Sequence, residues 1–108
     1  MNKDYLITII IVTFNAEKYI LNVLESLTSR INQKTEVVIV DGLSNDNTVK
    51  IIKNFAGYSI NLISEKDSGI YDAMNKGVSI AKGEFILFLG ADDQLFINLK
   101  ELSGNLVD

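Results

Sequence analysis

Two adjacent aspartates, Asp92 and Asp93, end the last hydrophobic run of this sequence, in the stretch FLGADD. Two carboxylates about 4 Å apart repel by about 4 kcal/mol at an effective dielectric of about 20. Either they point into water or a cation lies between them. The 108 residues include no cysteine and no histidine, which excludes thiolate chemistry, histidine bases and ordinary zinc sites. A metal here would be a hard, oxygen-binding ion such as Mg²⁺ or Mn²⁺.

Asp41 is a third candidate, at the end of the apolar run in VVIVDGLSND. It could belong to a turn-forming Asp-Gly pair. It could also accept hydrogen bonds from a base or a ribose, as acidic residues do in nucleotide-binding sheets, with Gly42 allowing close approach of the backbone. Residues 44–46 are better explained as helix caps than as ligands.

The segment EKDSGIYDAMNKG carries more polar side chains than the start of a helix needs. Asp67 or Ser68 can cap a helix, and Gly69 relaxes the turn before it. Asn75 and Lys76 are either an ordinary solvated helix face or contacts to a substrate, and the residue types leave both interpretations open.

The elements that position these residues follow from hydrophobic periodicity. Apolar, β-branched runs predict strands at residues 6–14, 36–40, 59–64 and 84–89. Spacings of three and four residues predict helices at 16–27, 47–55 and 70–81. The alternation predicts an α/β fold, a Rossmann-like and mainly parallel sheet with helices on both faces.

Two helices are specified further by the sequence. Asn15 stands where the N-cap of the first helix belongs. Ile70, Ala73 and Val78 belong to the apolar stripe expected for the third helix.

All four predicted strands end in polar residues, at 13–15, 41–46, 65–69 and 90–93. In a parallel sheet these ends meet at one edge, where such folds bind ligands. The paired aspartates are therefore expected at a binding edge rather than on a solvated loop. There is no glycine-rich dinucleotide or P-loop motif and no nucleophile elbow in the sequence.

Length and charge limit the classes of protein further. The 108 residues are expected to form one domain. A net charge of −4 without a basic patch argues against nucleic acid as a partner. The apolar run at residues 5–14 is too short to cross a bilayer as a helix, and no signal-peptide cleavage site follows it.

Three blocks in order, ITIIIVTFNAEKYILNVLESL, VVIVDGLSNDNTVKII and SEKDSGIYDAMNKGVSIAKGEFILFLGADD, resemble the donor-binding half of family 2 glycosyltransferases. The resemblance extends from residue 5 to about residue 95, and three blocks in register are more specific than any one of them. It implies a GT-A fold and an inverting transfer from a nucleotide sugar, expected to be a UDP-sugar. The acceptor would be a glycan or a lipid-linked molecule in bacterial surface polysaccharide synthesis.

The resemblance also implies roles for single residues. Thr13 looks like the contact to the uridine, and Asp41 is similar to the aspartate that recognises the base. The remaining positions assigned to the nucleotide-sugar pocket are Asn15, Asp67, Gly69 and Asn75.

Asp92 and Asp93 match the DXD-like motif of the family, the first near the ribose and the second as the metal ligand. Many family members carry Asp or Asn where this sequence has Gly90. One ligand or hydrogen bond is thus absent, so the metal would depend more on Asp93 and on the diphosphate.

The implied reaction is a single displacement at the anomeric carbon, in which the metal offsets the charge of the departing nucleoside diphosphate. The family's carboxylate base lies downstream of the DXD-like motif, in the acceptor half, and this chain ends at Asp108. Residues 1–108 are therefore expected to be one nucleotide-sugar-binding domain of a longer enzyme, which binds the donor without turnover. We expect a cytoplasmic location, at the inner membrane face in the longer protein. An uncovered apolar sheet edge would favour a homodimer.

Two alternatives belong to other classes. A non-catalytic nucleotide-binding or interaction module would keep the sheet and lack the chemistry. A receiver-type phosphoacceptor domain would need acidic residues after the first strand, where this sequence has Thr13, Phe14 and Asn15.

Overall fold

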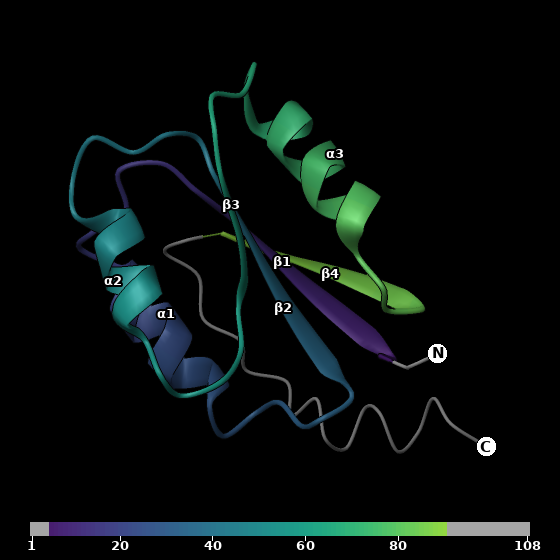
Figure 1. The fold of residues 1–108 in the computed structure, drawn as a ribbon. Coiled ribbons are helices and arrows are strands. Elements are labelled where there is room, and N and C mark those ends of the chain that lie inside the picture. The colour runs from purple at the N-terminus through teal and green to yellow at the C-terminus, as the bar shows by residue number, and fades with distance from the viewer. Residues whose placement is uncertain (1–4, 91–108) are drawn as a thin grey trace.

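The computed structural model describes residues 5–90. These residues form strands and helices that alternate along the chain (Figure 1). In chain order the elements are β1 (Ile7–Thr13), α1 (Ile20–Leu27), β2 (Thr35–Asp41), α2 (Thr48–Asn54), β3 (Asn61–Ser64), α3 (Ile70–Ile80) and β4 (Phe85–Gly90). The predicted order of elements is confirmed, and no boundary differs from the predicted one by more than four residues.

The strands form one parallel sheet in the order β3-β2-β1-β4. From β1 the chain steps outward to β2 and β3, and then crosses back so that β4 pairs with the free side of β1. Thr13 of β1 lies opposite Asp41 of β2, which lies opposite Ser64 of β3. Open α/β sheets bind ligands beyond the carboxyl ends of the strands, where the strand order reverses. Here that point lies between β1 and β4.

Helices cover both faces of the sheet, as the sequence predicts. α1 and α2 lie together on one face and α3 lies on the other (Figure 1). Alternate residues of β1 serve the two faces: Ile9 and Ile11 pack in the core with α1 and α2, whereas Ile10 packs with Ala73 of α3. β1 and β2 are buried almost throughout because both of their faces are covered, which explains their unbroken apolar runs.

α1 begins at Ile20, and its N-cap position is Tyr19, so the prediction of Asn15 as N-cap is wrong. A turn over residues 16–19 precedes the helix, with the N–H of Tyr19 and of Ile20 donating to the carbonyl of Ala16. Asn15 has a positive φ of 50°. Its side chain accepts a hydrogen bond from the loop after β2 instead of capping the helix.

α3 packs on the sheet through a narrower stripe than predicted. Ala73 and Gly77 are buried, but Ile70 and Val78 are 61% and 42% exposed, so the prediction that these two face the core is wrong. A Cβ on Gly77 would lie 2.7 Å from Cγ2 of Ile10. The small residues bring the helix axis close to the sheet, and this close approach leaves the flanking apolar side chains outside the contact.

Within residues 5–90, no helix combines the length and the apolar character that a membrane crossing requires.

Candidate functional site

The carboxyl ends of β1, β2 and β3 are joined by main-chain and side-chain hydrogen bonds. The N–H of Gly42 donates to the carbonyl of Thr13 at 2.9 Å, and the N–H of Glu65 donates to the carbonyl of Asp41 at 3.0 Å. The pairing thus continues one residue past the ends of β2 and β3. The polar residues that the sequence assigns to this edge do meet there.

Asp41 lies at the centre of this edge and its side chain is fully buried. The Thr13 hydroxyl donates to its Oδ1 at 2.7 Å, and the Ser44 hydroxyl donates to the same oxygen. The Ser44 N–H donates to Oδ2 at 2.8 Å, and the Ser64 hydroxyl does so at 3.0 Å. The last residues of β1 and β3 and the loop after β2 are therefore tied to one carboxylate.

The hydrogen bonds decide the charge state of Asp41. Burial by itself raises the pKa of this carboxyl, because desolvation penalises the charged form. The donors on Ser44, Thr13 and Ser64 outweigh burial and bring the pKa below its ordinary value. Asp41 is consequently an anion at neutral pH, held inside the fold.

The loops after β1 and β2 are also tied to each other. The N–H of Asn15 donates to the Ser44 hydroxyl at 2.8 Å, and the N–H of Asn45 donates back to Oδ1 of Asn15 at 2.8 Å. Deeper in the fold, the N–H of Ala16 donates to the buried hydroxyl of Thr48 at 2.8 Å. The amide oxygen of Asn15 therefore connects two loops in this structure, and its expected contact to a nucleotide sugar stays a prediction.

Asp67 lies over the end of β2. Its Oδ1 accepts the N–H of Gly69 at 3.1 Å. A Cβ on Gly42 would lie 2.8 Å from Oδ2 of Asp67 and 3.5 Å from Cδ1 of Phe14. Because Gly42 has no side chain, a small space remains there, and the Asp67 carboxylate and the Phe14 ring both lie beside it.

Phe14 is a candidate that the sequence interpretation missed. Its ring is 60% exposed, at the carboxyl edge of the sheet, next to the polar loop ends. An exposed aromatic ring at a ligand-binding edge is a surface on which a nucleobase can stack. The signal in the sequence is its position directly after Thr13, at the end of a buried strand.

The loop after β3 is fastened to the first turns of α3. The N–H of Ser68 donates to Oδ2 of Asp72 at 2.9 Å. Lys76 donates from Nζ to the carbonyl of Lys66 at 2.7 Å and lies 3.5 Å from carboxylate oxygens of Glu65 and Asp72. These contacts hold Asp67 and Gly69 in place at the edge. Gly69 has a φ of 126°, a conformation that favours glycine.

Asn75 lies one turn along α3 and is exposed, so its expected contact to a donor stays a prediction. Asp92 and Asp93 lie outside the described residues. The last residue of β4, Gly90, pairs with Val12 of β1, so the chain leaves β4 at the same carboxyl edge as Thr13 and Asp41.

The described part of the chain contains no cluster of three or more acidic side chains that could hold a metal ion. The donor chemistry of the chain still suits Mg²⁺ or Mn²⁺, since oxygen ligands are available and histidine and cysteine are absent. The residues expected to bind the ion are the two aspartates that follow β4.

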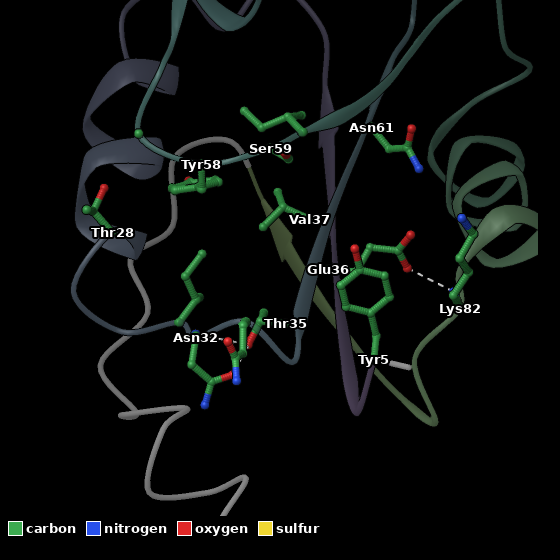
Figure 2. Close-up of a pocket in the computed structure, with 14 residues that line it drawn as sticks. Tyr5, Thr28, Asn32, Thr35, Glu36, Val37, Tyr58, Ser59, Asn61 and Lys82 are labelled. Atoms are coloured by element: carbon green, nitrogen blue, oxygen red, sulfur yellow. Dashed lines mark hydrogen bonds between the residues drawn. The ribbon is translucent and has the colours of Figure 1, made fainter. Parts of the chain in front are cut away.

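An open hollow of about 560 Å³ lies at the opposite, amino-terminal edge of the sheet (Figure 2). Tyr5, Glu36, Tyr58 and Lys82 are among the residues that line it. Burial raises the pKa of Tyr58, whose hydroxyl donates to the carbonyl of Leu24 at 2.8 Å. Among residues 5–90, none of the site residues predicted from the sequence lines this hollow, and we place the functional site at the carboxyl edge.

The sheet order and the polar carboxyl edge define an open, parallel α/β protein whose polar residues gather at the strand ends. Comparison with known proteins narrows the class. Residues 8–102 match the model of the family described as glycosyl transferase family 2. The chain belongs to glycosyl transferase family 2, and the predicted family is confirmed.

Two relatives of this chain are named glycosyltransferases. A PGL/p-HBAD biosynthesis glycosyltransferase of Mycobacterium bovis is 41% identical over 92 residues, which cover 82% of this chain and 36% of the relative. The poly(ribitol-phosphate) beta-N-acetylglucosaminyltransferase TarS of Staphylococcus aureus is 35% identical over 100 residues, which cover 88% of this chain and 17% of TarS. The chain therefore spans well under half of the length of these relatives.

Solved structures confirm the fold. S. aureus TarS 1–349 in complex with UDP superposes with a TM-score of 0.82 at 32% identity, covering 92% of this chain and 31% of that one. The mannosyltransferase PcManGT from Pyrobaculum calidifontis, solved with GDP-Man and Mn²⁺, superposes with a TM-score of 0.82 at 26% identity, covering 94% and 32%. The sheet of this protein is the nucleotide-binding part of a GT-A fold.

Proposed function

We propose that this chain binds the nucleotide-sugar donor for an inverting glycosyltransferase of bacterial surface glycan synthesis, with a UDP-sugar as the donor. The observation that carries the proposal is the carboxyl edge of the sheet. There a buried anionic Asp41 joins the loops, while Asp67 and the exposed ring of Phe14 adjoin one small space beside Gly42. The structures of TarS with UDP and with UDP-GlcNAc support this choice of donor.

In this proposal each group at the edge has a separate task. Phe14 offers a face for the base, and the loop after β3, fastened by Lys76, closes one side of the pocket. Asp92 would contact the ribose, and Asp93 would hold Mg²⁺ or Mn²⁺. The ion, when bound, neutralises charge on the diphosphate. This role matters because the chain carries a net charge of −4, which by itself repels a diphosphate.

Calorimetry with UDP tests the proposal. We expect UDP to bind in the presence of Mn²⁺ and to bind at least about tenfold more weakly in EDTA, a difference of about 1.4 kcal/mol. Asp93→Ala should bind UDP equally in Mn²⁺ and in EDTA. Equal binding by the unmodified protein in both buffers would contradict the metal's role, and no binding in either buffer would contradict the donor site.

A further inference from the structure

The hollow at the amino-terminal edge of the sheet forms where β2 extends past the start of β3 (Figure 2). β2 begins at Thr35, but β3 pairs with it only from Val38, which lies opposite Asn61. In the part of the chain that the structure describes, residues 35–37 thus have no neighbouring strand on this side, and residues 57–60 form another part of the wall. The volume of about 560 Å³ lies within the range of about 300–1,000 Å³ that is typical of small-molecule sites.

Glu36, in this uncovered part of β2, has one carboxylate oxygen that no described donor meets. The residue is 6% exposed and lines the hollow. Its Oε1 accepts the Thr8 hydroxyl at 2.7 Å and the N–H of Lys82 at 2.8 Å, whereas no donor within residues 5–90 is hydrogen-bonded to Oε2. In Figure 2 the second oxygen points away from the bonded N–H of Lys82. A buried carboxylate oxygen without a donor is unfavourable, so a ligand that donates a hydrogen bond would be stabilised here.

The rest of the lining combines hydrogen-bonding groups with aromatic rings. Amide, hydroxyl and aromatic side chains come from Asn32, Gln33, Asn61, Ser59, Tyr5 and Tyr58. Among the lining residues, Glu36 and Lys82 carry the charges, one of each sign, so the hollow favours a neutral ligand. Each hydroxyl of a sugar both donates and accepts hydrogen bonds, and the C–H groups on the face of its ring pack on aromatic side chains. A neutral sugar therefore matches these groups better than a charged or a purely apolar molecule does.

We propose that the hollow at the amino-terminal edge is a second, non-catalytic site that binds a neutral sugar unit of a glycan, with Oε2 of Glu36 accepting one of its hydroxyls. Glu36 and Asp41 are five residues apart on β2, which separates them by about 17 Å at about 3.3 Å per residue. A sugar in the hollow is thus too far from the carboxyl edge to take part in the reaction there. The site would hold a glycan without acting on it, and it does not depend on which donor binds at the other edge.

The test is an NMR titration of the ¹⁵N-labelled chain with three neutral disaccharides, chitobiose, cellobiose and maltose. We expect at least one of them to shift the amide signals of Glu36, Tyr58 and Lys82 in a saturable way. Glu36→Gln should weaken that binding by about tenfold or more, because the amide oxygen can replace Oε1 for the buried donors while an NH₂ group replaces the acceptor at Oε2. Asn61→Ala, at an exposed position, should weaken it about threefold to tenfold.

Glu84→Gln is the matched control, since this exposed side chain is close in the chain to Lys82 and does not line the hollow. It should bind the disaccharide as the unmodified protein does. UDP with Mn²⁺ should not displace the disaccharide, because the two would bind at opposite edges.

Three results would overturn the inference: no saturable shift with any of the disaccharides, equal affinity in Glu36→Gln, or displacement of the sugar by UDP. A saturable shift with the diamine putrescine but with no disaccharide would also overturn it, since the hollow would then take cations. Failure to bind UDP would contradict the proposed function alone. Thermal unfolding of each variant confirms that it is folded.

Discussion

At the scale of single residues, Asp41 contributes to the fold through the four donors gathered around its carboxylate. In Asp41→Asn an amide NH₂ would face hydroxyl and N–H donors in a buried site. We expect the free energy of unfolding to fall by on the order of 3 kcal/mol, because buried donors lose a charged acceptor. The change is measured as a lower urea midpoint at an unchanged slope.

Asp46 offers a comparison for that prediction. Its carboxylate lies just before α2, whose N-cap position is Asn47, and accepts the N–H and the hydroxyl of Thr48. Its Oδ2 also accepts the N–H of Glu17 at 3.2 Å. Asp46→Asn should lower the urea midpoint less than Asp41→Asn does, because the Asp46 carboxylate is exposed to solvent and its donors can bond to water instead. An equal or smaller loss for Asp41→Asn would show that the buried cluster does not stabilise the loops.

At the scale of elements, a second polar cluster holds the turn between α3 and β4 against the start of the sheet. The buried hydroxyl of Thr8 donates to Oε1 of Glu36 at 2.7 Å. The N–H of Lys82 donates to the same oxygen at 2.8 Å, and Figure 2 shows this second bond. The N–H of Gly83 donates to the Thr8 hydroxyl at 2.8 Å. A Cβ on Gly83 would lie 2.6 Å from the backbone nitrogen of Thr8, so the turn lies directly on β1.

Removal of this cluster should loosen the turn that leads into β4. We expect Glu36→Ala to lower the free energy of unfolding by about 2 kcal/mol, because buried donors are left unpaired. The amides of Lys82 and Gly83 should then exchange hydrogen faster with solvent. Thr8→Val should lower the free energy of unfolding less when it is combined with Glu36→Ala than when it is made alone, since both residues belong to one network.

The neighbouring Glu84 provides the control, because its side chain is exposed on the same turn. Glu84→Gln should change stability by no more than about 0.5 kcal/mol. Similar losses for Glu36→Ala and Glu84→Gln would contradict a structural role of the cluster.

At the scale of the whole molecule, the stability of the fold should depend on pH through Asp41. Its pKa is lowered in the folded protein from an ordinary value of 3.8, so the unfolded chain takes up the proton first as the pH falls. The stabilisation is complete above the unfolded value and is lost below it, as the pH falls through the folded value. Urea midpoints at about pH 7 and about pH 3 should therefore differ, and the difference should be smaller in Asp41→Asn. Equal pH dependence in both proteins would show that other groups are responsible.

The sequence alone determined three features of this protein: the family, the alternation of elements, and the location of Thr13 and Asp41 at the carboxyl edge. They depend on local periodicity and on a general property of parallel sheets, that successive strand ends emerge at one edge. The helix start at Ile20 and the exposure of Ile70 were not determined in this way. Each depends on contacts with segments distant in the chain. Asn15 bonds to the loop after β2 instead of capping α1, which begins at Ile20. α3 packs closely on the sheet at Gly77, which leaves Ile70 outside the contact.

Only the tertiary structure decided how the aspartates divide their tasks. In the sequence Asp41 and Asp67 are both carboxylates after apolar runs, and either could face a ligand. The fold surrounds Asp41 with donors from the ends of β1 and β3 and from the loop after β2, and it leaves Oδ2 of Asp67 beside Gly42 and Phe14. Hydrogen-bond partners that lie more than twenty residues apart in the chain are set by strand order and register, and no local pattern of residues encodes them.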